Sequence, residues 1–136
     1  MGSGSEAAQP IVRDYMQGNV LTISINATLK EAGQKLSDKQ VSTLLVKDGE
    51  EFVGIVSDKR LAREGIAKGL APETATVGAV MRREFLTIEA DQPVREAQAM
   101  MKANGVRHLV VTEQGKIAGI VSISDLIRFY TDFFEQ

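Results

Sequence analysis

The pattern of apolar and polar positions in this 136-residue chain predicts two elements early in the sequence. A short apolar run over 21–23 is typical of a buried strand. After it, apolar residues recur every three or four positions over 28–39, which predicts an amphipathic helix. Thr28 followed by Glu31 has the spacing of a capping box, so this helix is expected to begin beside them.

The residues that follow predict a hairpin and a second helix. Apolar runs over 41–47 and 52–56 are separated by an Asp-Gly turn pair, so they are expected to pair as strands. Ser57 suits the start of a helix and Gly69 suits its end, which predicts a helix over 58–68. The predicted order is therefore strand, helix, strand, strand, helix.

The same order is predicted a second time. At an offset of 65 positions, residues 12–61 align with 77–126 without a gap, and 15 of the 50 pairs are identical. Self-similarity of this kind indicates a duplicated supersecondary unit. The second copy predicts three strands and two helices, at 86–88, 107–112 and 117–121, and at about 93–103 and 124–134.

We therefore expect an α/β (α+β) fold of two tandem β-α-β-β-α repeats. Each repeat of about sixty residues is small for a core of its own, so the repeats are expected to pack together through their sheets. The predicted division is a cloning remnant or disordered lead-in over 1–10, a first repeat over 11–70, a linker over 71–76 and a second repeat over 77–136.

Composition excludes several classes of function. Lys and Arg number 16 against 18 Asp and Glu, and a net charge of −2 argues against non-specific binding to nucleic acid or to anionic membranes. The chain has no cysteine, which excludes disulfides and thiolate chemistry, and it has no P-loop motif. No apolar run approaches the roughly 20 residues of a membrane span, and no secretion signal is recognisable. A cytoplasmic setting is expected, and no metal site is predicted.

Three motifs occur in both copies. They are a G-I-V-S segment at 54–57 and 119–122, a V-x-x-L-x-V strand at 41–46 and 106–111, and a preceding stretch that ends in methionine, at 14–16 and 79–81. Together with the duplicated order of elements, they resemble the tandem cystathionine-β-synthase (CBS) domain pair, or Bateman module, over residues 11–130.

This resemblance implies a regulatory module and not an enzyme. The two repeats would pack with pseudo-twofold symmetry and leave two clefts that bind an adenosine-type ligand such as AMP, ADP, ATP or S-adenosylmethionine. No cofactor would be required beyond this regulatory ligand. The resemblance also implies a homodimer and an effector protein as partners.

The chemistry of an adenosine nucleotide points to the start of the last predicted helix. A carboxylate can accept hydrogen bonds from both ribose hydroxyls, each worth about 1.5–3 kcal/mol. Asp125 is the expected acceptor, with hydroxyl groups from Ser122 and Ser124 beside it. Free backbone donors at the helix start are expected to favour phosphate oxygens. Arg107 is the expected phosphate ligand, because its planar fork matches two oxygens.

The resemblance implies the rest of this first cleft. His108 would be a weaker phosphate ligand beside Arg107. The residues expected to line the base are mostly apolar: Met16, Leu21, Val41, Ser42 and Ile120.

The second cleft differs at the position that matters most. It would be built around Ser57, with Arg60 at the position equivalent to Asp125 and with walls from Met81, Leu86 and Val106. Loss of a charged acceptor should weaken an adenosine ligand about tenfold to a hundredfold, since 1.4 kcal/mol corresponds to one decade. We expect one competent cleft and one that is degenerate or differently selective, in which Lys59 and Arg60 could hold an anion.

Structural interpretations of these residues remain open. Asp125 could only complement the helix dipole, and Ser57 and Ser122 could only cap helices. His108, Ser122 and Asp125 are the residue types of a catalytic triad, but no nucleophile elbow accompanies them, so no catalytic residue is assigned.

The end of the chain leaves a further alternative. Aromatic residues are concentrated in the last predicted helix, and they could pack against the N-terminal segment or form a dimer contact: Phe129, Tyr130, Phe133 and Phe134. The predicted function is adenosine-nucleotide sensing in the cleft between the repeats. The alternative is a dimerisation or partner-docking module whose clefts are vestigial.

Overall fold

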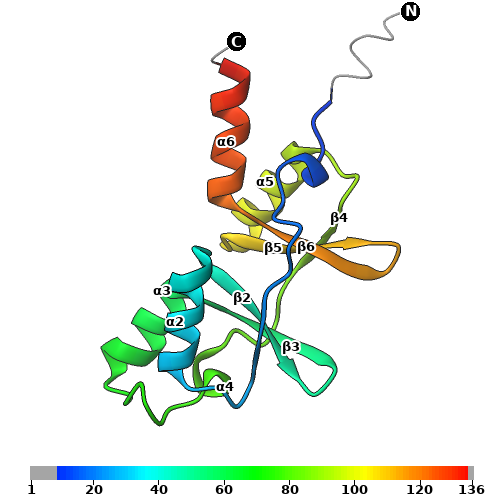
Figure 1. Cartoon of the computed structure of the whole chain (residues 1–136). Helices are drawn as coiled ribbons and strands as arrows, with labels where there is room; N and C mark the ends of the chain where they lie inside the picture. The colour runs from blue at the N-terminus through cyan, green and yellow to red at the C-terminus, as the bar shows by residue number, and fades with distance from the viewer. Residues whose placement is uncertain (1–8, 135–136) are drawn as a thin grey trace, which may run out of the picture. The chain divides into compact units, whose positions relative to one another are not determined.

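The computed structural model describes residues 9–134 and divides into two compact units (Figure 1). Unit 1 joins Met1–Val20 to Leu86–Gln136, and unit 2 is Leu21–Phe85. Each unit contains one three-stranded sheet, and helices complete the mixed α/β architecture that the sequence predicts. No helix among the described residues is long and apolar enough to cross a membrane.

Unit 2 contains the sheet β1-β2-β3, in which β1 is parallel to β2 and β2 is antiparallel to β3. Its elements follow the predicted order, with bounds shifted by one or two residues: β1 (Thr22–Ser24), α2 (Leu29–Lys39), β2 (Thr43–Asp48), β3 (Glu51–Ser57), α3 (Asp58–Arg60), η2 (Leu61–Gly65), η3 (Ile66–Lys68) and α4 (Val77–Val80). The predicted capping box of α2 is confirmed, since Thr28 Oγ1 accepts from the Glu31 N–H at 3.1 Å and Glu31 Oε1 accepts from the Thr28 N–H at 2.8 Å.

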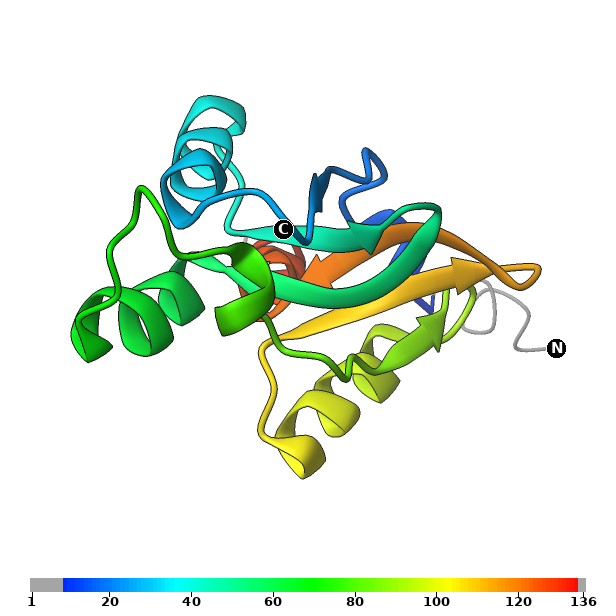
Figure 2. The ribbon, with the colours of Figure 1, turned by 90° about the horizontal axis from the view of Figure 1, so that it is seen from below.

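Unit 1 repeats this sheet as β4-β5-β6, with the same parallel and antiparallel pairs. Figure 2 shows α5 lying beside β5. The elements of unit 1 are η1 (Val12–Asp14), β4 (Thr87–Glu89), α5 (Val94–Asn104), β5 (His108–Glu113), β6 (Lys116–Ser122) and α6 (Ile123–Phe134). The duplicated order of strands and helices is therefore confirmed.

The prediction of one helix over 58–68 is confirmed in its bounds, but the helix is α-helical only in its first turn. That stretch is a single turn of α-helix, followed by the π-helical turn η2 and the 3₁₀ turn η3, and it ends at Gly69 with φ of 79°. The change of helix type accompanies close packing at Gly65, where an added Cβ would lie 2.8 Å from Leu29 Cδ1. The equivalent α6 runs unbroken for 12 residues.

Each unit is completed by a segment from the start of the other repeat. We name residues 9–20 the first leader and residues 76–85 the second leader. The first leader belongs to unit 1, with the strands of the second repeat, and the second leader belongs to unit 2, with the strands of the first repeat. The compact units therefore cut across the two sequence repeats.

The leaders make equivalent hydrogen bonds in the two units. In unit 1 the Val12 N–H donates to the Gln92 carbonyl at 2.9 Å, and in unit 2 the Val77 N–H donates to the Ala27 carbonyl at 2.8 Å. In unit 1 the Val94 N–H also donates to the Pro10 carbonyl at 3.2 Å. Residues that correspond at the 65-residue offset thus make equivalent backbone hydrogen bonds.

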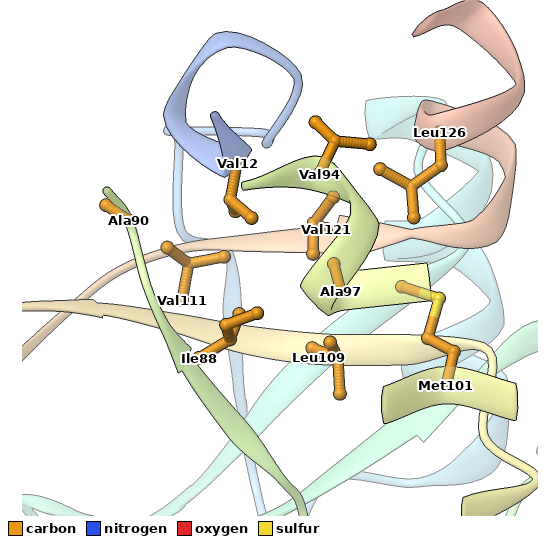
Figure 3. Packing of buried hydrophobic residues seen from close by; sticks show 10 residues of the cluster. All are labelled: Val12, Ile88, Ala90, Val94, Ala97, Met101, Leu109, Val111, Val121 and Leu126. Carbon is orange, nitrogen blue, oxygen red and sulfur yellow. The ribbon is translucent and has the colours of Figure 1, made fainter. Parts of the chain in front are cut away.

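The first leader also contributes to the core of unit 1. Val12 is fully buried, and Figure 3 shows its side chain beside residues of the sheet and helices. The buried cluster comprises Val12, Ile88, Ala90, Val94, Ala97, Met101, Leu109, Val111, Val121 and Leu126. Unit 1 therefore needs a segment that lies more than sixty residues away from its strands in the sequence.

Candidate functional site

The start of α6 gathers several predicted site residues within unit 1. The antiparallel pairing of β5 and β6 places His108 opposite Ser122. Immediately after Ser122 the chain enters α6, and the Ile123 N–H donates to the Arg107 carbonyl at 2.9 Å. We name Arg107, Ser122 and Asp125 the unit 1 corner.

Asp125 is held at this corner by a reciprocal cap. The Asp125 N–H donates to Ser122 Oγ at 3.1 Å, and the Ser122 N–H donates to Asp125 Oδ2 at 2.8 Å. This pair satisfies two backbone donors that the helix itself leaves without partners. A carboxylate has two oxygens with about four acceptor positions, so the cap fixes the group and leaves it further capacity to accept hydrogen bonds.

Backbone donors at the start of α6 are less free than the sequence suggested. The N–H groups of Ile123 and Asp125 both donate within the protein. Ser124 is exposed between them, and the Arg107 side chain is also exposed. Phosphate recognition at this corner would therefore depend more on Arg107 than on the helix start.

The first leader runs beside the strand that ends at this corner. Gln17 forms an antiparallel bridge with Ile120, through N···O distances of 2.8 and 3.1 Å. A Cβ added to Gly119 would lie 2.5 Å from the Gln17 carbonyl oxygen and 2.9 Å from Met16 Sδ. Only glycine at position 119 allows this approach, which sets Met16 near β6 three residues before Ser122.

The predicted site residues are divided between the units. Those in unit 1 are Met16, Leu86, Val106, Arg107, His108, Ile120, Ser122, Ser124 and Asp125, and those in unit 2 are Leu21, Val41, Ser42, Ser57, Arg60 and Met81. Leu21 and Val41 pack against the core of unit 2, and Val106 packs against the core of unit 1. A ligand site that draws residues from both units stays a prediction.

Unit 2 builds the equivalent corner from Ser42, Ser57 and Arg60. Thr43 pairs with Ser57, and the Asp58 N–H donates to the Ser42 carbonyl at 3.0 Å. Ser57 Oγ accepts from the Arg60 N–H at 3.1 Å, as in unit 1. The Arg60 side chain, however, does not return to Ser57. We name these three residues the unit 2 corner.

The guanidinium of Arg60 is instead bonded to the second leader. Arg60 Nε donates to the Val80 carbonyl at 2.6 Å. One helical turn later, the hydrogen bond and charge of Lys68 hold the pKa of the Glu64 carboxyl below its usual range, with a smaller contribution from the charge of Arg60. The unit 2 corner therefore presents a cation that already has a protein partner.

Two residues near the unit 1 corner, Arg128 and Tyr15, were not predicted from the sequence. Arg128 donates from Nη2 to the Asp14 carbonyl at 3.4 Å and lies over the Tyr15 ring, with Cζ 5.1 Å from the ring centroid. Tyr15 also meets Phe129 edge-on, with centroids 5.6 Å apart, so Phe129 packs against the N-terminal segment. The other three aromatic side chains of α6 lie outside the described residues: Tyr130, Phe133 and Phe134.

Signals for part of this arrangement were present in the sequence. Gly54 and Gly119 are identical across the offset, and a glycine inside a strand indicates close approach of another backbone. Arg63 and Arg128 are also identical across the offset. No sequence pattern, however, indicates which leader each strand contacts.

Comparison with known proteins agrees with this geometry. The family profile of the CBS domain matches twice, at residues 12–66 and 77–132. The chain is 28% identical over 117 residues to Hypoxic response protein 1 of Mycobacterium tuberculosis, covering 85% of this chain and 82% of that protein. It is 31% identical over 117 residues to the uncharacterized protein YlbB of Bacillus subtilis, covering 85% of this chain and 78% of that protein.

Solved structures are also similar. A hexameric CBS-CP12 protein from bloom-forming cyanobacteria gives a TM-score of 0.83 at 25% identity, covering 94% of this chain and 75% of that chain. Hypoxic Response Protein I, solved with two coordinated zinc ions, gives a TM-score of 0.71 at 26% identity, covering 88% of this chain and 98% of that chain. Among residues 9–134 of the present protein, no group of three or more His, Cys, Asp or Glu side chains is arranged to hold a metal ion.

The duplicated order of elements, the two equivalent corners and the two profile matches lead to one assignment. This chain belongs to the CBS-domain family and is a tandem pair of CBS domains.

Proposed function

We propose that this CBS-domain pair is a regulatory module, without catalytic activity, that binds an adenosine nucleotide at the unit 1 corner. The observation that carries the proposal is the reciprocal cap between Ser122 and Asp125. It holds a carboxylate in one geometry before any ligand arrives, which lowers the entropic cost of binding.

The chemistry of the corner suits the two ends of a nucleoside phosphate. The remaining acceptor positions of Asp125 suit a ribose diol, whose two hydroxyls both need an acceptor. The Arg107 carbonyl accepts from the first residue of α6, so Arg107 lies at the start of the helix that contains Asp125, and its side chain is exposed. Arginine binds phosphate oxygens in pairs. AMP, ADP, ATP and S-adenosylmethionine are the candidates to test.

The test compares Asp125 with a second acid at a helix start. Asp58 opens α3 in unit 2, and its side chain accepts from the Lys59 N–H at 2.6 Å. Asp125→Asn retains an oxygen for the cap but removes the charge, so we expect it to bind the best of the four ligands about tenfold to a hundredfold more weakly than the parent. Asp58→Asn should bind like the parent. Calorimetric titration gives the affinities, and thermal melting checks folding.

Two results would contradict this proposal. One is that none of the four ligands binds the parent protein or raises its melting temperature. The other is that a folded Asp125→Asn binds as tightly as the parent.

Association is a second candidate function, supported by exposed apolar side chains. Ile127 on α6 and Ile66 on η3 are each 59% exposed. Contiguous apolar surface exposed on a helix often marks a contact surface, and a structural neighbour is described as a hexamer. Light scattering of the parent and of Ile127→Glu, with and without saturating AMP, tests this alternative. A mass that falls in Ile127→Glu but is indifferent to nucleotide would favour association over sensing.

A further inference from the structure

The first leader docks on one surface of unit 1. The Arg13 N–H donates to the Ala90 carbonyl at 2.9 Å, next to the bond from Val12, and Val12 is fully buried in the core of this unit. We name the leader surface the residues of unit 1 that the leader meets through its backbone, its ion pair and its ring contacts: Ala90, Gln92, Glu113, Ile120, Arg128 and Phe129. Without a leader on this surface, part of the unit 1 core would be open to water.

Side chains of the first leader add contacts that only this leader can make. Arg13 forms an ion pair with Glu113, and the ring of Tyr15 contacts both Arg128 and Phe129. The second leader has glycine and valine at the positions equivalent to Arg13 and Tyr15. It has neither the charge nor the ring, so it fits the leader surface less well.

Unit 2 has an equivalent surface that the first leader does not fit. Gly78 takes the place of Arg13 there, and its N–H donates to the Ile25 carbonyl at 3.0 Å. A Cβ added to Gly78 would lie 2.8 Å from Ile25 Cγ1, which is too close for both atoms to stay in place. The residue of unit 1 equivalent to Ile25 is Ala90, whose small side chain leaves room for Arg13. The size of residues 25 and 90 therefore separates the two leaders.

The first leader is joined along the chain to unit 2 and not to the strands that it completes. The chain passes from unit 1 to unit 2 between Val20 and Leu21. Gly18, Asn19 and Val20 are in neither helix nor strand, and within the described chain no hydrogen bond involves them. A change of conformation at these three residues would therefore break no hydrogen bond of their own. Exchange of an identical segment between two molecules is a low-cost route to a dimer.

We propose that the leader surface of unit 1 is an interaction surface for the first leader of a second copy of this chain, and that the pairing of Arg13 with Ala90 makes this docking selective. Two molecules that exchange first leaders regain every contact of the docked leader. Docking within one molecule competes, because a short connection gives the leader a local concentration of about millimolar. Exchange is therefore expected to increase with protein concentration, and to dominate where docking within one molecule is mismatched.

The test mismatches docking within each molecule and restores it between molecules. Ala90→Ile makes unit 1 resemble unit 2, so its own Arg13 should no longer fit. Arg13→Gly supplies a leader that fits the larger residue, and its unchanged Ala90 accepts the leader of the first variant. The two full-length variants are unfolded together and refolded at about 0.1 mM each. We expect a mixed dimer about tenfold more abundant than either homodimer, counted by native mass spectrometry.

Matched controls separate leader exchange from other association. The double variant Arg13→Gly, Ala90→Ile is matched within its own chain, so mixing it with the parent should give no excess of mixed dimer. An equal excess in this control, or no mixed dimer from two folded single variants, would overturn the proposal. The mixed dimer should also persist when Ile127→Glu is added to both chains, and its loss would assign the dimer to α6 instead.

Selectivity between the leaders is tested in the single chain. Gly78→Ala should lower the melting temperature by roughly 5–10 °C, because the added carbon meets Ile25. Adding Ile25→Ala to Gly78→Ala should recover most of that loss, although Ile25→Ala alone should destabilise the protein. Additive losses in the double variant would show that residue size at these positions does not separate the leaders.

A second pair of variants covers the case in which Ala90→Ile does not fold. The side chains of Arg13 and Glu113 are 42% and 44% exposed, so Arg13→Glu and Glu113→Arg should each fold with like charges facing one another. Exchange in the mixed dimer restores opposite charges at both leader surfaces. The mixed dimer should again exceed both homodimers, and added salt should reduce the excess. Monomers alone, or a random mixture of dimers at low salt, would contradict leader exchange.

Discussion

The two corners share one backbone arrangement and the serine, but they differ in their other two side chains, Arg107 against Ser42 and Asp125 against Arg60. In both, a serine at the end of the third strand caps the next helix, with N···O distances of 3.1 Å. In both, a leader bridges the residue two positions before that serine. Asp125 then turns back to complete its own cap, whereas Arg60 reaches out to the leader. Duplication has preserved the backbone arrangement, and the side chain of the third helical residue has a different partner in each unit.

The helices that follow extend this contrast. Leu126 in α6 is almost fully buried, but the equivalent Leu61 lies in the π-helical turn and is only partly buried. A regular α-helix can bury one face along its whole length, whereas the helix over 58–68 changes type where Gly65 approaches α2. We therefore expect α6 to depend on its core contacts more strongly than its counterpart does.

The largest expected effect tests this difference in burial. Leu126→Ala should lower the free energy of unfolding by about 2–5 kcal/mol, because it removes a fully buried side chain and leaves a cavity. Leu61→Ala should lower the free energy of unfolding clearly less, because Leu61 is only partly buried. Urea unfolding, fitted for midpoint and slope, measures both. Equal losses would contradict the contrast between the two helices.

The next effect tests the close approach of a leader to a strand glycine, which the two units share. Gly119→Ala and Gly54→Ala would each force a Cβ against a leader carbonyl, at 2.5 Å from Gln17 and 2.7 Å from Arg82. We expect each to cost about 1–3 kcal/mol of unfolding free energy. Gly33→Ala is the control, because it lies inside α2 with nothing within 4 Å of the added carbon. That change should stabilise the protein by about 0.4–1 kcal/mol.

A smaller effect concerns the serine caps. Ser122→Ala and Ser57→Ala each remove an oxygen that accepts from a helix N–H, so each should cost about 0.5–2 kcal/mol. Conservative Ser→Thr changes should recover most of the loss. Ser124→Ala, at an exposed position, should change little. Thermal melting measures all these variants. A loss of stability in Ser124→Ala as large as in Ser122→Ala and Ser57→Ala would contradict the assigned caps.

The smallest effect belongs to unit 2 alone. Because Lys68 lowers the pKa of Glu64 in the folded protein, the ion pair contributes stability at pH above the usual glutamate pKa, and the contribution disappears as pH falls through the lowered pKa. Glu64→Gln should therefore melt slightly below the parent at pH 7 and together with it at pH 3. Added salt should shrink the difference at pH 7. Unit 1 has Phe129 at this position.

Most of the fold was predictable because its signals are local. The capping box at Thr28, the glycine that ends α5 and the turn between β2 and β3 all involve residues within a few positions of one another. The bounds of the helix over 58–68 were predicted, but its change of helix type was not, because the contact between Gly65 and Leu29 lies outside any local pattern. For the candidate site, spacing identified Ser122 with Asp125 and Ser57 with Arg60, but not the partners of their side chains.

By itself, the sequence determined the duplication, the order of strands and helices and the contrast between Asp125 and Arg60. Periodicity within a segment and identity at a fixed offset can both be read without knowing any contact in space. Only the tertiary structure decided that each leader completes the unit of the other repeat, that Arg60 is bonded to Val80 and that Arg128 performs the equivalent task one turn later. These contacts join segments far apart in the chain, and burial and backbone hydrogen bonding select them without leaving a local pattern.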